Sequence, residues 1–299
     1  MDLLKVGTAH SHFIYKYGYK GAFAKLRECG FDSVDFSFFA YQAEKDFILL
    51  KSDGDLKSFC YDLKAVANDN DVIVGQTHAP YYFLPTERYF DSDMTEIFIK
   101  SVKATAWLGS KYIVIHPIIF KDPENNFMRA FDANKKFYGR LKSVALDYGV
   151  EIAIENLCAV NELRTCGVPS STSSAEKLGF LIDAMGEGFC ACLDTGHAFF
   201  CGESPAHFAR GLGKRLKVVH LQDGDGLDDM HIPPTLGLID WQDFLKALVE
   251  IDYNGILNME ISYRRFCGMN HIIETGKFLS SIGKDFAMQI NGLKGANLK

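Results

Sequence analysis

The stretch from Val218 to Trp241, VVHLQDGDGLDDMHIPPTLGLIDW, decides how the rest of the chain is interpreted. Its apolar start predicts a strand that ends near His220, and a helical pattern begins at Ile239. The loop between them is rich in groups that bind metals or protons: Asp223, Asp225, Asp228, Asp229 and His231. The order is therefore a strand, a polar loop and a helix.

Five other predicted strands also end in a polar residue of metal-binding type. These residues are His78 in QTHAPY, His116 in IVIHPI, Glu155 in IAIENL, Asp194 in CLDTGH and Glu260 in ILNMEI. With His220 included, the successive intervals are 38, 39, 39, 26 and 40 residues. Such intervals are typical of one strand, one helix and two loops, so one such side chain recurs in each βα unit.

The whole chain predicts one parallel barrel. Strands are expected at 4–8, 33–37, 71–78, 112–116, 151–155, 189–194, 217–221 and 256–261. Helices are expected at about 20–29, 55–68, 92–109, 127–148 and 175–184, with a last helix and a ragged tail after residue 268. Eight strands alternating with helices predict a single (β/α)8 TIM barrel, and the 299 residues exceed the ~250 that this fold typically needs. We expect one domain over residues 1–299.

Composition excludes several classes of protein. Hydrophobic content of 47% and charged content of 23% are those of a globular protein, and no apolar run reaches the ~18 residues of a membrane span. The first residues lack the pattern of a signal peptide, so a cytoplasmic location is expected. A net charge of -6 disfavours nucleic acid and anionic membranes as partners. Assembly into a homo-oligomer remains open.

The eight cysteines do not form a recognisable framework. They contain no C-x-x-C pair, and their positions are 29, 60, 158, 166, 190, 192, 201 and 267. In a reducing compartment such cysteines are expected to be free and buried, and a zinc–thiolate site has little support.

Four of the strand-end residues form a mixed oxygen and nitrogen set: Glu155, Asp194, His220 and Glu260. Such a set suits a divalent ion such as Zn²⁺, Mn²⁺, Co²⁺ or Mg²⁺. Strand periodicity places Ala153, Cys192, Val218 and Asn258 inward beneath them, respectively. Four isolated buried polar groups are the alternative, but uncompensated carboxylates in one mouth would cost several kcal/mol each.

Further histidines extend the set. His78 and His116 could hold a second ion bridged by Glu155, and His197, Asp229 and His231 could hold a third. The alternative is that these histidines donate hydrogen bonds to a substrate or support another ligand. His10, His12, His207 and His271 are expected to be surface or support residues.

The chain resembles the xylose isomerase-like TIM barrels, which join sugar isomerases and epimerases to abasic-site endonucleases with three zinc ions. The matching phrases are THAP, VIHP, IENL, LDTGH, HLQD, DMHIPP with LGLIDW, and MEI, although Thr235 stands where relatives have a glycine. The resemblance implies metal ligands at Glu155, Asp194, His220 and Glu260, with both glutamates as the acid–base pair. The endonuclease branch adds the ligands His78, His116, His197, Asp229 and His231.

The preferred hypothesis is a metal-dependent isomerase or epimerase of a sugar, a sugar phosphate or an inosose. Glu155 and Glu260 would transfer a proton through a metal-stabilised enediolate. Candidates for orienting the substrate are His197, His231, Arg264 and Arg265.

Two alternatives stay open. A zinc-dependent endonuclease would use the complete ligand set, but a DNA-binding protein must also neutralise several phosphates. The nearest basic candidates, Arg210, Lys214, Arg215 and Lys217, lie beside the start of a strand, at the end away from the expected mouth. A non-catalytic barrel that binds a sugar is the other alternative.

Overall fold

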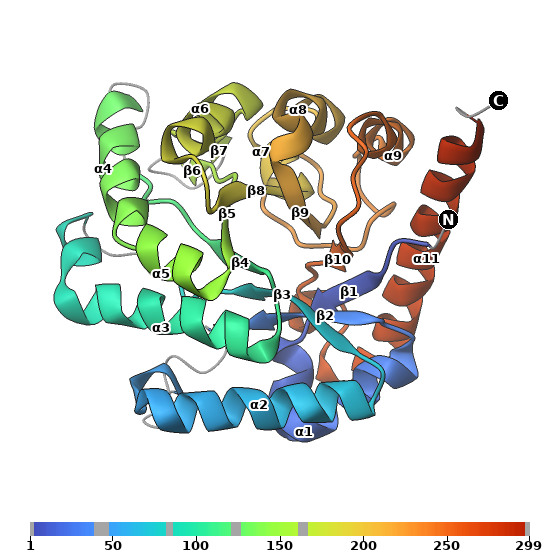
Figure 1. Cartoon of the computed structure of the whole chain (residues 1–299). Helices are drawn as coiled ribbons and strands as arrows, with labels where there is room; N and C mark the ends of the chain where they lie inside the picture. The colour runs from blue at the N-terminus through green and yellow to red at the C-terminus, as the bar shows by residue number, and fades with distance from the viewer. Residues whose placement is uncertain (1–2, 39–47, 82–85, 121–126, 161–166, 297–299) are drawn as a thin grey trace.

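The strands close into a parallel barrel that is covered by helices on its outside (Figure 1). A computed structural model describes residues 3–38, 48–81, 86–120, 127–160 and 167–296. The eight barrel strands are β1 (Val6–Ala9), β2 (Ser33–Ser37), β3 (Ile73–His78), β4 (Tyr112–Ile115), β5 (Glu151–Glu155), β8 (Phe189–Asp194), β9 (Leu216–Leu221) and β10 (Leu257–Met259). Pairing of β1 with β10 closes the barrel, which confirms the predicted (β/α)8 fold.

The helices fill the intervals between strands. They are α1 (Ser11–Cys29), α2 (Asp53–Asp69), α3 (Ser92–Leu108), α4 (Phe127–Gly139), α5 (Lys142–Tyr148), α6 (Ala175–Met185), α7 (Thr195–Phe200), α8 (Pro205–Leu212), α9 (Trp241–Glu250), α10 (Tyr263–Phe266) and α11 (Ile272–Ala296). Short 3-10 turns lie at Ile48–Leu50, Thr86–Phe90, Gly213–Arg215 and Met269–His271. A small antiparallel pair, β6 (Ala159–Val160) and β7 (Gly167–Val168), follows β5. Among the described residues no helix is both long and apolar enough to cross a bilayer.

Some predicted elements have different bounds. The first helix begins at Ser11 rather than Lys20, because the chain continues through a kink at Gly18, whose φ is +69°. The helix expected over 127–148 is two helices. The first ends at Gly139, and the amides of Arg140 and Leu141 form a turn by bonding the carbonyls three residues back before the second begins at Lys142. The short elements β6, β7, α7, α8 and α10 were not predicted, and the expected tail at 297–299 lies outside the described residues.

The interior of the barrel is filled below the mouth. A small core cluster contains Val114, Ala153, Cys190, Cys192 and Val218, separate from the larger core between strands and helices. The prediction that Ala153, Cys192 and Val218 face inward is confirmed. Because these side chains fill the barrel, polar groups at the strand ends can meet only at its open end.

Candidate metal centre at the barrel mouth

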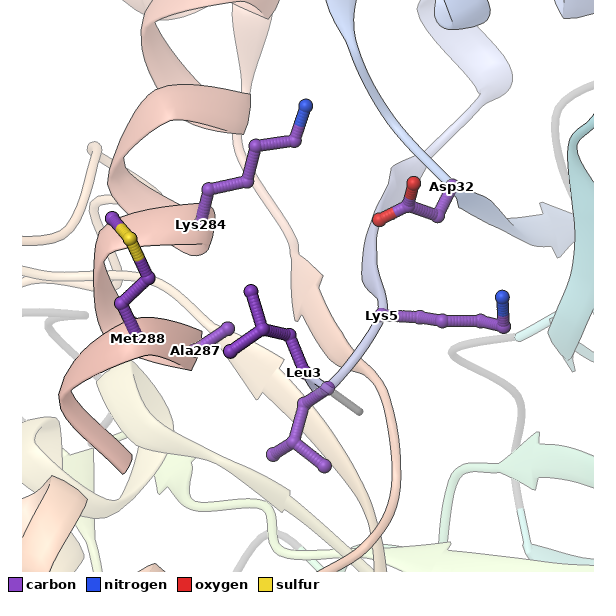
Figure 2. Close-up of a pocket in the computed structure, with 7 residues that line it drawn as sticks. Leu3, Lys5, Asp32, Lys284, Ala287 and Met288 are labelled. Atoms are coloured by element: carbon purple, nitrogen blue, oxygen red, sulfur yellow. The ribbon is translucent and has the colours of Figure 1, made fainter. Parts of the chain in front are cut away.

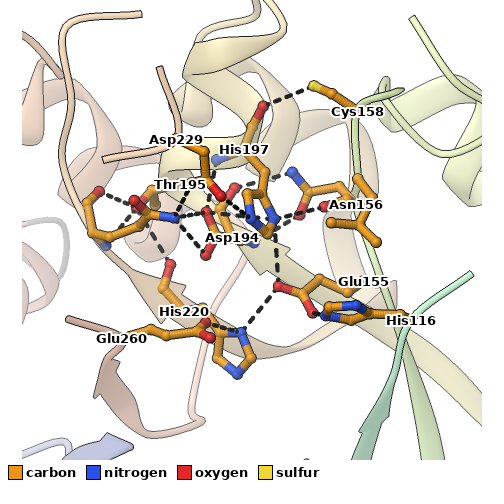
Figure 3. Close-up of polar contacts among 12 residues, drawn as sticks. His116, Glu155, Asn156, Cys158, Asp194, Thr195, His197, His220, Asp229 and Glu260 are labelled. Atoms are coloured by element: carbon orange, nitrogen blue, oxygen red, sulfur yellow. Dashed lines mark hydrogen bonds and ion pairs between the residues drawn. The ribbon is translucent and has the colours of Figure 1, made fainter. Parts of the chain in front are cut away.

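Four predicted ligands converge at the carboxyl ends of neighbouring strands. Glu155 ends β5, Asp194 ends β8, His220 lies in β9 and Glu260 follows β10. One ligand atom from each lies within 4.8 Å of the corresponding atoms of the other three. Nδ1 of His220 lies 3.1 Å from Glu155 Oε1 and 2.5 Å from Glu260 Oε2 (Figure 3).

The carboxylates at this centre are held close to an imidazole in a buried place. Burial favours the neutral form of Glu260, but the adjacent His220 lowers the pKa of that carboxyl to about 2. For Glu155 the same competition holds the pKa well below its usual range. Burial opposes protonation of His220, yet nearby acidic groups, including Glu260 and Glu155, hold its pKa well above the ordinary value. Without metal the centre therefore holds a protonated imidazole among carboxylates.

Asp194 is fixed by the backbone around it. Its Oδ1 accepts a hydrogen bond from the His197 amide at 2.7 Å and so caps α7. Asn156 binds both the amide and the carbonyl of Asp194, at 2.7 and 3.0 Å. The side chain of Gln222 donates to both Asp194 carboxylate oxygens, at 3.0 and 3.1 Å. The carboxylate is thus oriented by contacts from three segments.

His78 and His116 face Oε2 of Glu155, whereas His220 faces Oε1 of the same carboxylate. Their Nε2 atoms are 3.4 and 2.9 Å from Glu155 Oε2, and their ring centroids are 4.8 Å apart. A ligand atom of His78 also lies within 4.8 Å of ligand atoms of Glu155 and His220. The structure therefore brings both predicted histidines to the glutamate that was expected to bridge two ions.

A third group consists of His197, Asp229 and His231, whose ligand atoms also lie within 4.8 Å of one another. Asp229 Oδ2 is 3.6 Å from His197 Nε2, and Asp229 Oδ1 is 3.3 Å from His231 Nε2. Burial disfavours a charged His231, but the hydrogen bond and charge of Asp229 raise its pKa to about 9. Asp229 is 38% exposed, so this group is the outermost part of the mouth.

The loop that carries Asp229 and His231 is organised by Asp223. This fully buried carboxylate accepts hydrogen bonds from the backbone amides of Gly224, Thr235 and Ile239 and from Trp241 Nε1. A Cβ on Gly237 would lie 2.3 Å from Asp223 Oδ1, so this position admits only glycine. One carboxylate therefore fixes the loop quoted at the start of the sequence analysis.

Several site residues escaped the sequence reasoning. Asp35 accepts a hydrogen bond from His220 Nε2 at 2.9 Å, and Gln222 contacts Asp194, Asp229 and the His231 amide. Asp35 is the middle residue of β2, with the same parity as Ser33 and Ser37, so strand alternation could have indicated that it faces inward. Gln222 and Asn156 lie within the family phrases HLQD and IENL, which are the signal that could have found them. Arg264 is exposed on α10, and the side chain of Arg265 lies outside the described ones.

The remaining histidines were expected to lie on the surface or to support neighbouring residues, and the structure contains examples of each. His10 is fully buried, and its Nδ1 accepts a hydrogen bond from the Ser37 amide at 3.3 Å. The side chain of His207 is 76% exposed on α8.

The expectation of free cysteines is wrong for one pair. Cys158 and Cys201 form a disulfide, with Cα atoms 6.0 Å apart. Cys158 follows β5, which ends at the mouth, and Cys201 follows α7, which begins there. Cys29, Cys60, Cys190 and Cys192 are free and buried and Cys267 is free and partly buried, whereas Cys166 lies outside the described residues.

A shallow pocket at the opposite end of the barrel lacks such groups. It lies between the start of β1 and α11 and is lined by Leu3, Leu4, Lys5, Asp32, Lys284, Ala287 and Met288 (Figure 2). Asp32, its one carboxylate, already accepts the Val6 amide at 3.2 Å. Among the described residues, the groups that could hold a metal ion lie at the mouth.

The family model described as xylose isomerase-like TIM barrel matches residues 23–282. The chain belongs to this family. An uncharacterized protein of Methanocaldococcus jannaschii is 29% identical over 158 residues, which are 51% of each chain. An inosose isomerase of Bacillus subtilis is 23% identical over 166 residues, 52% of this chain and 55% of the enzyme. The chain thus spans about half the length of these curated relatives.

Solved structures of the family share the fold. A D-tagatose 3-epimerase-like protein superposes with a TM-score of 0.73 at 22% identity and covers 97% of this chain and 99% of its own. The IOLI protein, whose structure contains a bound zinc atom, superposes with a TM-score of 0.66 at 16% identity, covering 96% and 99% respectively. At these identities the likeness establishes the barrel.

Proposed function

We propose that this chain is a divalent-metal-dependent isomerase or epimerase of a small sugar, a sugar phosphate or an inosose. The observation that carries the proposal is the convergence of Glu155, Asp194, His220 and Glu260 within 4.8 Å. The names of the relatives add support, since they include an inosose isomerase and a D-tagatose 3-epimerase-like protein.

The donor set suits a divalent ion. Oε2 of Glu260 is buried and accepts no hydrogen bond from the described residues, although it lies 2.5 Å from His220 Nδ1. Glu155, Asp194, His220 and Glu260 would hold Zn²⁺, Mn²⁺, Co²⁺ or Mg²⁺, for which three carboxylates and an imidazole are suitable ligands. Such an ion supplies Lewis-acid polarisation of a carbonyl oxygen, which makes the adjacent C–H more acidic.

The two glutamates are the proposed proton carriers. A low pKa keeps Glu260 ionised at neutral pH, and its side chain is 20% exposed, against 1% for Glu155. Glu260 is therefore the base that a substrate entering the mouth meets first. It would take the proton from the carbon beside the carbonyl, and the electron pair of that bond would move toward the oxygen. For the return step Glu155 would have to carry a proton, which it would give to the other face or carbon. Glu260 would then be left protonated and Glu155 ionised, and proton exchange with water would reset both groups.

The outer mouth would orient the substrate. His197 and His231 present ring nitrogens beside Asp229, and Arg264 stands exposed on the element that follows Glu260. Hydroxyl or phosphate oxygens are suitable partners for these donors.

The endonuclease alternative has less support. Three of the basic residues near the start of β9 are neutralised within the chain: Arg210 pairs with Asp243 and Glu250, Arg215 with Asp183, and Lys214 with Asp252. Cations paired in this way contribute less to binding a DNA backbone.

Solvent exchange tests the proposal. Metal-loaded protein in deuterated water, incubated with a panel of ketoses, inososes and their phosphates, should place deuterium beside the carbonyl of one substrate. Glu260→Gln should reduce the exchange rate by about 10² to 10⁴-fold, because proton transfer contributes that much to rate. Glu187→Gln, an exposed site beyond α6, is the matched control and should exchange like the wild type.

Two results would overturn this function. One is a sugar that binds tightly and never exchanges, which would favour a binding protein. The other is efficient, His116-dependent cutting of an oligonucleotide that carries an abasic site, which would favour the nuclease.

A further inference from the structure

Both nitrogens of the His220 ring face carboxylates. Nδ1 points to Glu155 and Glu260, whereas Nε2 lies 2.9 Å from Oδ2 of Asp35 on the opposite side of the ring. Asp35 comes from β2, across the barrel from β9, and its side chain is buried. The carboxylate of Asp35 is not part of the four-ligand group.

The position of Asp35 is itself determined by a local irregularity of the sheet. The register between β2 and β3 shifts at this point, so that Asp35 pairs with Gln76 and Gly75 is skipped. A Cβ on Gly75 would lie 2.0 Å from the Ile256 side chain and 2.3 Å from the Ser33 hydroxyl, so a larger residue here would displace both side chains. The shift brings Gln76 Nε2 to 2.8 Å from Asp35 Oδ2, the same oxygen that faces His220. Irregularities of this kind are frequent beside active sites, where they direct a side chain.

We propose that Asp35 is a positioning residue that makes Nδ1 of His220 the metal-binding atom. Oδ2 of Asp35 accepts a hydrogen bond from Gln76 and lies 2.9 Å from His220 Nε2, so Nε2 is the nitrogen placed to donate to it. Nδ1 is then the nitrogen left to face Glu155 and Glu260, two of the other members of the four-ligand group. Gln76 keeps Asp35 from rotating, and the ring cannot turn without breaking the Asp35 bond. This inference rests on the metal centre of the proposed function and assigns a role outside its ligands.

Zinc affinity and nitrogen NMR test the role. Competition with a coloured chelator measures the affinity for Zn²⁺, and spectra of protein labelled with ¹⁵N-histidine show which ring nitrogen binds the ion. Wild-type protein should show a zinc-bound Nδ1 and a protonated Nε2 at His220. Asp35→Leu should weaken Zn²⁺ binding by about 10- to 100-fold, the usual effect of losing such a partner, and should lose this nitrogen pattern.

Two milder variants keep the test decisive if Asp35→Leu does not fold. Asp35→Asn retains an oxygen that can accept from both His220 and Gln76, so it should keep the nitrogen pattern and bind Zn²⁺ more weakly than wild type but more tightly than the leucine variant. Gln76→Leu should weaken binding without changing Asp35. Ser33→Ala is the control. Ser33 lies two residues before Asp35 on the same face of β2, and this variant should bind Zn²⁺ as tightly as the wild type does.

Affinities of the Asp35 variants within twofold of wild type, or an Nε2-bound ion in the wild type, would overturn the inference. So would wild-type protein that takes up no Zn²⁺. Neither readout uses a sugar, so the two proposals can fail separately. If these variants bind Zn²⁺ more weakly but the wild type exchanges no ketose hydrogen, the proposed reaction is contradicted and the role of Asp35 stands.

Discussion

At the residue scale, Asp194 links the folding of the mouth to its proposed chemistry. One oxygen caps α7 through the His197 amide, while both oxygens accept from Gln222. The same cap holds His197 in place beside Asp229. A capping bond contributes about 1 kcal/mol, so conversion of Asp194 to an apolar residue would disturb α7 and the candidate metal centre together.

The ion pairs of Asp229 give a pH-dependent contribution to stability. His231 has a pKa of about 9 in the folded protein, where burial is outweighed by the hydrogen bond and charge of Asp229, against an ordinary histidine value of 6.5. The stabilisation from its protonated form is therefore complete below pH 6.5 and is lost as pH rises through about 9. In chelator, the melting temperature of the wild type should exceed that of Asp229→Asn at pH 6, and this difference should shrink by pH 10.

The control for this comparison is Asp225→Asn, in the same loop. Asp225 accepts from the backbone amides of Leu227 and Asp228, which an asparagine oxygen can still do. A difference between wild type and Asp229→Asn that grows with pH would contradict the assignment.

At the element scale, the segment between β9 and α9 is ordered although it contains little regular structure. Asp223 binds four donors from within 18 positions along the chain, and Gln222 holds the amide of His231, whose φ is +49°. A buried carboxylate without these donors would cost several kcal/mol. The loop is thus held by buried hydrogen bonds, and it carries Asp229 and His231 into the mouth.

The backbone of Thr235 in this loop is strained, so a substitution at this position should stabilise the folded protein. Its φ is +74°, a region that β-branched residues rarely adopt, and its side chain is exposed. Replacement by glycine relieves about 1–3 kcal/mol of strain and costs about 0.5–1 kcal/mol of chain entropy. Thr235→Gly should therefore raise the free energy of unfolding by about 1 kcal/mol in denaturant titrations.

Thr235→Ala separates strain from side-chain loss. Alanine keeps a Cβ in the left-handed region, so it should not reproduce the gain. A glycine variant that is less stable than wild type would show that the threonine side chain stabilises the loop.

At the scale of the whole molecule, closure of the barrel brings acidic groups from β2, β5, β8 and the segment after β10 to one place. In the metal-free protein, histidines compensate for the repulsion between these acidic groups. We propose that a bound metal ion compensates for it better. Metal and fold should therefore be thermodynamically linked.

Chelation should lower the melting temperature, and added Mn²⁺ or Zn²⁺ should restore it. At 100 times the dissociation constant, a bound ion stabilises by about 2.7 kcal/mol. Glu155→Gln and Asp194→Asn should abolish the restoration, whereas Asp183→Asn, whose carboxylate binds Arg215 on the outer helix layer, should keep it. An unchanged melting curve after verified metal removal would argue against the centre.

The sequence by itself determined the barrel and the strand ends that carry Glu155, Asp194, His220 and Glu260. It could do so because alternation along a strand and the spacing of βα units are local properties, visible in residues a few positions apart. The elements that it misjudged are short, such as α7 and α8, or lie before a break, as the start of α1 does before Gly18.

Only the tertiary structure decided which side chains meet. The Asp35–His220 bond joins residues 185 positions apart, and the disulfide joins Cys158 to Cys201 across 43. The side-chain amide of Gln222 reaches both Asp194, 28 positions earlier in the chain, and Asp229, seven positions later. Such contacts depend on how the strands are staggered when β1 pairs with β10, and on the register shift at Gly75. A local sequence pattern specifies neither the stagger of the strands nor this register shift, because both are set by the packing of the complete barrel.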